Sequence, residues 1–376
     1  MAAYTTIDDP SAFFQCTHYT GNGGSNHGIV NGGNSDLKPD ILWYKCTSDA
    51  ASHILYDSSR EHDSGENKFL TVNTTAIDKT DAQMFESFDT DGFSLNTDTD
   101  GNGNGRTYAA WQWKVNGGTI ANNTDGDLTT SVQVNQTAGC SIITYTGLDP
   151  IEPLDLGHGL GKIPEFWFIK SREIGAKQWG VYHKDMNSTP QNYYLTMHTT
   201  NAATAASTWW RNEAPTTTII KTGEQDDVNR ANSDYICYAW TSIQGFSKFG
   251  KYVGNSLDDG PFIYTGFKPA LIWIKRIPQG TAYSSWGIFD NKMFAENGSH
   301  NNGDVLWINK SAAAGKRGNG SSANGTSTNI IDFLSNGFKV RDGGSDEIND
   351  PSDIYIYMAW AESPFVTSTG VPTTAK

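Results

Sequence analysis

The sequence has no long apolar run, few cysteines and a deficit of basic residues, and each shortage excludes a class of protein. No apolar run of about 18 residues or more occurs, so no transmembrane helix is expected. Lysine and arginine number 27 against 41 aspartates and glutamates, and the net charge of -14 would repel nucleic acid and an anionic membrane. The four cysteines lie far apart without a Cys-x-x-Cys pair, which predicts buried free thiols rather than disulfides or a zinc site.

Catalytic signatures are also missing. The chain has no Gly-x-Ser-x-Gly, no His-Glu-x-x-His and no phosphate-binding glycine loop that leads into a helix. Carboxylates are numerous, but no spacing selects a pair for glycoside hydrolysis. We therefore expect a protein that is not an enzyme and that needs no cofactor. A depolymerase acting on surface polysaccharide is the alternative from the enzyme class.

Glycine and aromatic residues, in contrast, are abundant. The sequence has 39 glycines, and aromatic residues make up 12% of it. Aromatic and β-branched side chains fill pleated sheets, while glycine, asparagine and aspartate supply turns. No segment keeps the 3.6-residue amphipathic period of a helix over three turns. The composition therefore predicts an all-β fold.

Three stretches of the chain carry the same landmarks in the same order, which indicates an internal repeat. A Tyr-Thr-Gly triplet comes first, at 19–21, 145–147 and 264–266. An apolar run that begins with proline and ends with lysine follows, as PDILWYK (39–45), PEFWFIK (164–170) and PALIWIK (269–275). An aromatic strand closes each copy, at 108–111, 238–240 and 357–360.

Each landmark has the form of a short strand, and we expect about six strands in each copy. A sheet with one apolar face must bury that face against another sheet, so each copy is predicted to form a β-sandwich or jelly roll. The predicted fold is thus all-β, with three tandem homologous β-sandwich modules. Their predicted bounds are 1–118, 119–250 and 251–376, and the second begins with a polar linker or an extra edge hairpin.

The repeat sorts the 12 tryptophans into shared and unshared positions. Residues that recur in every copy are expected to lie in the core, because each module fills the same interior. The two sets expected there are Trp43, Trp167 and Trp273, and Trp111, Trp240 and Trp360. Trp307 and Trp209 have no tryptophan counterpart, which makes them candidates for a role outside the core.

Trp307 is a candidate for a ligand-binding aromatic residue. Strand alternation sends its ring outward, and Asn309 follows two positions later. Sugars bind where an exposed aromatic ring lies beside amide or carboxylate groups, so this pair is typical of a carbohydrate site. Trp209 and His183 are further candidates for ligand contacts. The alternative is that a neighbouring module or subunit buries Trp307.

The stretch NTDTDGNGNGRTYAAW (96–111) carries acidic and amide side chains at the spacing of a calcium loop. If calcium binds, its ligands would be Asp98, Asp100 and Asn102. A helix–loop–helix calcium site also needs a glutamate at the twelfth position, where this chain has Ala109. We therefore expect a hairpin turn between two strands, with the polar residues serving turn geometry.

The repeat units resemble a module of tailed-bacteriophage structural proteins. The segments that carry the resemblance are CSIITYTG (140–147), LGHGLGKIPEFWFIKSR (156–172), QGFSKFGKYVGNSLDDGPFIYTGFKPALIWIKR (244–276) and IYIYMAWAESPF (354–365). Modules of this kind are common in phages of marine bacteria, including cyanophages. The match covers residues 119–366 closely and residues 1–118 with diverged turns.

The resemblance implies a virion structural protein with a lectin-like β-sandwich fold. A tail fibre or tail-associated protein that recognises host-surface glycans is the first role it implies, and a capsid decoration or cement protein is the second. The implied partners are other virion proteins and a host-surface glycan. A homo-oligomer is expected, with a trimer as the family's usual state. Neither nucleic-acid binding nor membrane insertion is expected.

Overall fold

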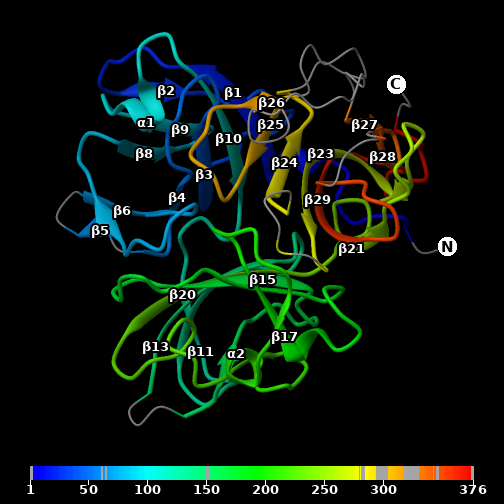
Figure 1. Cartoon of the computed structure of the whole chain (residues 1–376). Coiled ribbons are helices and arrows are strands. Elements are labelled where there is room, and N and C mark those ends of the chain that lie inside the picture. Colours follow the sequence, from blue (N-terminus) through cyan, green and yellow to red (C-terminus); the bar gives the residue numbers. More distant parts are fainter. Residues whose placement is uncertain are drawn as a thin grey trace.

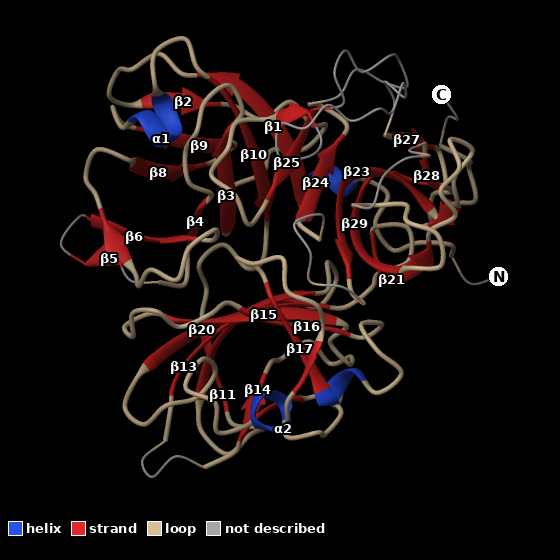
Figure 2. Cartoon of the chain, viewed as in Figure 1, coloured by secondary structure: helices blue, strands red, loops and turns tan. Residues whose placement is uncertain are grey.

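Antiparallel β-strands make up most of the chain, as its composition predicts (Figure 2). The computed structural model describes residues 3–373 except 61, 64–65, 149–151, 279, 281–283, 294–303, 317–329, 342 and 344–346. Across this part of the chain there are 29 strands and only two α-helices, α1 (Thr99–Asn102) and α2 (Ser207–Trp210). Each helix is a single turn, so the prediction of an all-β fold is confirmed.

Three large sheets form the body of the molecule, and they arise from successive parts of the chain (Figure 1). The first contains, in spatial order, β1 (Phe14–Thr20), β10 (Thr107–Trp113), β3 (Ile41–Cys46), β4 (Ile54–Asp57), β6 (Glu66–Thr71) and β5 (His62–Asp63), with β7 (Lys79–Thr80) beside β6. The second contains β11 (Ala121–Asn123), β12 (Thr130–Asn135), β13 (Cys140–Thr146), β20 (Asp234–Trp240), β15 (Phe166–Ser171), β16 (Gly180–His183), β17 (Tyr193–Thr196) and β18 (Thr204–Ala205). The third contains β21 (Ser247–Val253), β29 (Ile354–Pro364), β23 (Phe267–Arg276), β24 (Trp286–Asp290), β25 (Asp304–Trp307) and β26 (Gly315–Lys316).

Three small sheets accompany the large ones. They consist of β2 (His27–Ile29), β9 (Gly92–Leu95) and β8 (Phe85–Asp89); of β14 (Leu154–Gly157) and β19 (Ile219–Thr222); and of β22 (Phe262–Tyr264), β28 (Gly337–Val340) and β27 (Ile331–Leu334). Tyr56 of β4 stacks on Phe85 of β8 with ring centroids 4.6 Å apart, and Phe338 of β28 lies 5.4 Å from Tyr357 of β29. A small sheet thus packs on the outer face of a large sheet to form a β-sandwich.

Five strands occur in the same order in all three large sheets. The orders are β1-β10-β3-β4-β6, β13-β20-β15-β16-β17 and β21-β29-β23-β24-β25. The repeated sequence landmarks therefore fall on corresponding strands. The second sheet also carries β11 and β12, which pair with each other and then with β13, so this segment is the edge hairpin and not a free linker. The domain boundaries near 118 and 250 stay a prediction.

The inner faces of the three large sheets meet in one aromatic core. Trp113 of β10, Trp240 of β20 and Trp360 of β29 form a triangle with ring centroids 5.3–6.1 Å apart and planes tilted by 60–74°. Trp273 of β23 extends this cluster, since it lies 5.2 Å from Trp360 and 5.0 Å from Trp43 of β3. Tilted aromatic pairs of this kind attract each other beyond the area that they bury. The triangle therefore joins all three sheets at one point.

One predicted set of core tryptophans is shifted by a residue. Phe168, and not Trp167, occupies the position of Trp43 and Trp273, because the Phe168 ring faces the shared core 6.5 Å from Trp43. Trp167 lies on the opposite face of β15 and stacks on Tyr182 with centroids 3.7 Å apart. A step of one residue along a strand changes the face on which a side chain lies, so Trp167 is not the predicted counterpart of Trp43 and Trp273, although it is buried as predicted.

A stacked pair of tyrosines recurs in each large sheet and fixes the register of the closing strands. The pairs are Tyr19 with Tyr108, Tyr145 with Tyr235, and Tyr252 with Tyr355, all with centroids 5.0–5.2 Å apart. The fifth residue after the second tyrosine is Trp113, Trp240 or Trp360, so Trp111 is not the counterpart that we predicted. The same pairs place the third Tyr-x-Gly landmark at 252–254 and not at 264–266.

Neighbouring large sheets are linked by two hydrogen bonds that recur at all three interfaces. The first joins backbone groups at 2.8–3.1 Å: the N–H groups of Asp78, Ala203 and Ala314 donate to the oxygens of Arg172, Ile277 and Thr47. The second comes from a ring N–H at 3.0 Å: Trp179 donates to Thr74 O, Trp286 to Thr196 O and His53 to Trp307 O. The links run from the first sheet to the second, from the second to the third and from the third back to the first, so they close a ring.

Replacing Trp113 with alanine should destabilise the whole chain, because it opens a cavity where the three sheets meet. We expect the free energy of unfolding to fall by roughly 3–5 kcal/mol. Urea denaturation followed by circular dichroism measures this change. Leu257→Ala is the control, since Leu257 is 57% exposed and its truncation should change the free energy by less than about 0.5 kcal/mol. A similar small change for Trp113→Ala would contradict a shared core.

Candidate functional site

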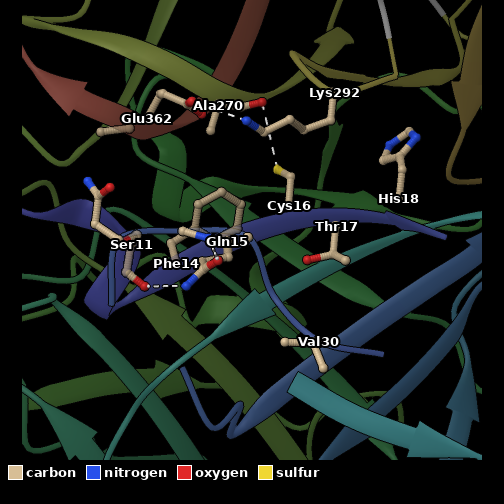
Figure 3. Close-up of a pocket in the computed structure, with 14 residues that line it drawn as sticks. Ser11, Phe14, Gln15, Cys16, Thr17, His18, Val30, Ala270, Lys292 and Glu362 are labelled. Carbon is tan, nitrogen blue, oxygen red and sulfur yellow. Dashed lines mark hydrogen bonds and ion pairs between the residues drawn. The ribbon is translucent and has the colours of Figure 1, made fainter. Parts of the chain in front are cut away.

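An open pocket of about 570 Å³ lies between β1 of the first large sheet and the strand ends of the third. The residues that define its walls are Cys16 and His18 on β1, Gly32 and Gly33 in the loop after β2, and Lys292 and Glu362 on the third sheet. Figure 3 shows Cys16 directed toward Ala270 on one side of β1, with Val30 on the other side. The pocket is therefore built from segments that are far apart in the sequence.

His18 and Asp290 contact each other across this interface, with Nε2 3.2 Å from Oδ1. Asp290 is fully buried and also accepts hydrogen bonds from Trp111 Nε1 at 3.0 Å and from the Met293 N–H at 2.6 Å. Burial alone would raise the pKa of Asp290, but the bonds from His18 and the other donors lower it below its usual value. Asp290 therefore stays ionised and ties β24 to the first sheet.

Cys16 precedes His18 by two residues on the same face of β1, so a cysteine and a histidine line the pocket with the buried Asp290 behind them. Cysteine nucleophiles use side chains of these types, with the thiolate as the reactive form. Here burial raises the pKa of the Cys16 thiol well above its usual value, and the charges of Asp290 and Glu362 raise it further. The thiol lies 3.8 Å from the carbonyl oxygen of Ala270. This arrangement keeps Cys16 protonated and does not activate it.

Polar groups of both charges lie on the third-sheet wall of the pocket. Lys292 Nζ is 3.3 Å from Glu362 Oε1, and Asn291 Nδ2 donates to Glu362 Oε2 at 2.7 Å. The Lys292 side chain is 49% exposed, so the ion pair adds little to stability. These groups are instead available to donate and accept hydrogen bonds with a ligand that enters the pocket.

Trp307 does not line this pocket, and its ring is not exposed. The residue is 7% exposed, its backbone oxygen accepts a hydrogen bond from His53 of the first sheet, and its ring lies 5.5 Å from Lys310 Nζ. Strand alternation placed the ring on the correct side of β25, but that side is not open: the ring lies over Gly287 of β24, where an added Cβ would be 3.3 Å from it. The prediction of an exposed Trp307 is therefore wrong, because the ring packs on its own sheet.

Asn309 and Trp209 are also engaged within the chain. Asn309 Oδ1 accepts the backbone N–H of Trp286 at 3.0 Å, which fixes the turn after β25. Trp209 is 2% exposed and stacks on Tyr194 with ring centroids 4.1 Å apart. Trp209 therefore belongs to the core of the second sheet, and the prediction that it contacts a ligand is not supported by its position.

His183 is fully buried, and both of its ring nitrogens have partners. Nδ1 accepts the Asp185 N–H at 3.1 Å, and Nε2 lies 3.3 Å from Tyr357 O, to which it donates in the tautomer that satisfies both contacts. Burial lowers the pKa of His183 to about 3, so the ring is neutral. His183 links the second sheet to the third and offers no atom to a ligand from solvent, contrary to the prediction.

The acidic stretch 96–111 does not form the predicted hairpin, because β9 and β10 belong to different sheets and α1 lies between them. Asp98 caps α1 by accepting the Asp100 N–H at 2.7 Å. Burial and the charge of Asp98 raise the pKa of Asp100. Asn102 is fully buried, and its amide oxygen accepts the Asn22 N–H and contacts His27 Nδ1 at 2.7 Å. Asn102 is therefore engaged in structure and is not free to bind calcium.

Asn102 has counterparts that sequence reasoning missed. Asn229 and Asn349 are also fully buried, and their side chains bond to the Glu152 oxygen and the Asn255 N–H respectively. The signal was present, since each asparagine lies six residues before the tyrosine that opens the closing strand. Among the residues with defined positions, no three His, Cys, Asp or Glu side chains are grouped to hold a metal ion.

Three lysines that are buried in the structure were also not identified from the sequence. They are the last residues of the proline-led runs, Lys45, Lys170 and Lys275, and all are fully buried. Each ammonium group donates to the backbone oxygen of the next residue at 2.5–2.9 Å, and Lys275 also donates to Thr200 O of the second sheet at 3.3 Å. Burial lowers the pKa to about 8 for Lys45 and Lys170 and to about 7 for Lys275.

Fold and pocket together define an all-β protein of antiparallel sheets packed around one aromatic core. The chain belongs to the family described as a domain of unknown function (DUF7483), which matches residues 9–364 and so spans all three large sheets. No curated protein and no solved structure matches the chain. No helix in the described ranges is long and apolar enough to cross a membrane.

Acid should destabilise the protein through His183. The unfolded chain protonates this residue near pH 6.5 and the folded chain only near pH 3, so this contribution to stability is lost progressively as the pH falls below 6.5. Between pH 7 and pH 5 the loss from His183 should be about 2 kcal/mol. Urea denaturation of the wild type and of His183→Asn measures it, because the variant lacks the titrating group. Equal pH dependence in the two proteins would contradict a neutral buried ring.

Alkaline pH should relieve a penalty that buried Lys275 imposes. In the folded chain the pKa of Lys275 is about 7, below the ordinary value of 10.5. Between pH 7 and pH 10.5 the unfolded chain therefore binds a proton that the folded chain does not, and the stability of the folded chain rises as the pH rises through this range. From pH 7 to pH 9.5 the wild type should gain roughly 2–3 kcal/mol relative to Lys275→Met. Chemical denaturation at both pH values gives the comparison. A difference that stays constant with pH would show that Lys275 is protonated throughout.

Proposed function

We propose that this chain is a structural component of a tailed-phage virion that acts through assembly contacts and not through catalysis. One observation carries the proposal: side chains that could serve chemistry instead hold the large sheets together. The bonds are Tyr238 OH to Asp57 at 2.5 Å, His183 Nε2 to Tyr357 O at 3.3 Å and Trp111 Nε1 to Asp290 at 3.0 Å. Each bond joins a different pair of sheets, which favours a rigid body over a mobile active site.

The burial of the aromatic residues supports an assembly role over glycan recognition. All 12 tryptophans are buried, including both that were candidates for sugar contacts. A sugar site needs an accessible aromatic ring beside polar groups, and Trp307, Trp209 and His183 do not supply one. Assembly within the particle therefore takes precedence over host-glycan binding in this proposal.

The resemblance of the repeat units to tailed-phage structural modules supports the virion location. A rigid body with no long fibrous segment fits a subunit that decorates the capsid or attaches to the tail. Other virion proteins are the proposed partners, and a homo-oligomer is part of the proposal. A depolymerase is not proposed, because glycoside hydrolysis uses two carboxylates and Glu362 is the one carboxylate among the described residues that line the pocket.

Purified particles of the phage that encodes this chain should contain it as a stoichiometric component. Mass spectrometry of gradient-purified virions measures its presence, and immunogold labelling shows whether it lies on the capsid or the tail. Absence from washed particles would contradict the proposal. Release of reducing sugar from host polysaccharide, lost on changing a single carboxylate to its amide, would also contradict it and would favour the depolymerase.

A further inference from the structure

None of the described strands pairs with the outer edge of β1. Phe13 O accepts the Lys114 N–H, and the Gly21 N–H donates to Arg106 O, so the odd-numbered residues of β1 face β10. The even-numbered residues therefore direct their backbone N–H and C=O groups to the open edge. These residues are Phe14, Cys16, His18 and Thr20. No described residue forms a hydrogen bond with their outward backbone groups.

The chain itself covers the corresponding edge of the second large sheet with a strand and that of the third only at its start. In the second sheet β12 pairs along β13 and places Gln133 opposite Ile142, the counterpart of Cys16. In the third sheet the turn before β21 folds back, and the Ser247 N–H donates to Ile243 O. The described chain forms no such contact along the edge of β1, and an unpaired edge can accept a strand from another chain.

This open edge is recessed, which limits what can bind it. Phe14, Cys16 and Thr17 are only 2%, 9% and 9% exposed, although no strand covers them. The pocket runs along these residues between the loop after β2 and the third sheet (Figure 3). The edge of a second folded sheet would collide with these walls. A single extended segment fits between them, and it would span roughly 14 Å opposite residues 14–18.

One wall of the pocket is suited to β-branched apolar side chains. In the second sheet, Val132 and Val134 of β12 pack on the loop after β14, where a Cβ on Gly159 would lie 3.3 Å from both valines. The loop after β2 has no such cover: Val30 is 71% exposed, and a Cβ on Gly32 would meet no atom within 4 Å. Two apolar residues at positions i and i+2 of an added strand would fill this space.

The opposite wall is suited to an amide. Asn291, next to Lys292, has a buried amide oxygen with no hydrogen-bond partner in the described structure. Its counterpart in the first sheet is Ser58, and Ser58 Oγ accepts a hydrogen bond from Gln133 Nε2 at 3.0 Å. A glutamine on an added strand, opposite Cys16, would donate to Asn291 in the same way.

We propose that the open edge of β1 binds an extended arm of another protein chain, which joins the first large sheet as an antiparallel strand. The arm carries two β-branched apolar residues on either side of a glutamine, as Val132, Gln133 and Val134 do on β13. Backbone hydrogen bonds to Cys16 and His18 hold the arm, and the three side chains select it. The inference rests on the pocket alone and stands whether or not the chain is a virion protein.

The test uses the full-length chain and a fluorescein-labelled peptide with the sequence of residues 129–136, TTSVQVNQ. Fluorescence anisotropy should show saturable binding with a Kd below about 1 mM. Hydrogen exchange should show new protection of the Cys16 and His18 amides in the complex. Protection of these two amides would locate the peptide on β1. It would also exclude the alternative that the peptide displaces the chain's own β12 from β13.

Two modified peptides test the pairing itself. In an antiparallel pairing the N–H at the Gln133 position faces β1, whereas the N–H at the Val132 position faces away. An N-methyl group at Gln133 should weaken binding at least about tenfold, and one at Val132 should leave it within about twofold. Equal effects of the two N-methyl groups would overturn the proposal.

Gly32→Trp tests the position of the site, because it fills the pocket from a point where the new side chain meets no atom. Gly175→Trp is the matched control: a Cβ there also meets no atom within 4 Å, and the residue lies in the β15–β16 turn. Both variants should melt like the wild type, and only Gly32→Trp should lose peptide binding. Binding that survives Gly32→Trp, or no binding to the wild type up to about 1 mM, would overturn the proposal.

Discussion

The contact among Trp113, Trp240 and Trp360 is the interaction on which the rest of the fold depends. Each large sheet is apolar on both faces, and its small sheet covers only the outer one. The inner faces can leave water only by packing on one another, and three curved sheets do so around a common point. Large rings suit that point, because a few tilted indoles fill a three-sided space without a void. The three sheets thereby share one core.

Burying three sheets against each other also buries their polar strand ends, which explains why so many titratable groups lie at the interfaces. Asp57, His183 and Asp290 end corresponding strands, and each bonds to a neighbouring sheet. Lys45, Lys170 and Lys275 are the penultimate residues of the preceding strands, and each donates to a backbone oxygen. A buried polar group is tolerated when its hydrogen bonds are made. These residues therefore fix the relative position of the sheets, which apolar packing alone would not specify.

Local patterns predicted the strands and the fold class, because alternation and turn residues act over a few positions. They did not fix register: in the run that contains Trp167, the tryptophan lies one position before the counterpart of Trp43, although the proline and lysine of that run would have corrected the alignment. Alternation also gave the face on which Trp307 lies, but not that the ring would pack over Gly287 of the neighbouring strand and leave solvent. The pair His18 and Asp290 had no local signal, since 272 residues separate them. Asn102 did have one, because its spacing to the following tyrosine recurs in each repeat.

A single shared core requires the three large sheets to unfold together. Hydrogen exchange at increasing urea, resolved to individual peptides, gives the free energy of opening for β10, β20 and β29 separately. These strands carry the three core indoles, so their opening free energies should agree within about 1 kcal/mol and converge on that of global unfolding. An opening of β20 at a free energy several kcal/mol below that of β10 and β29 would contradict the shared core and would show that the second sheet is an independent domain.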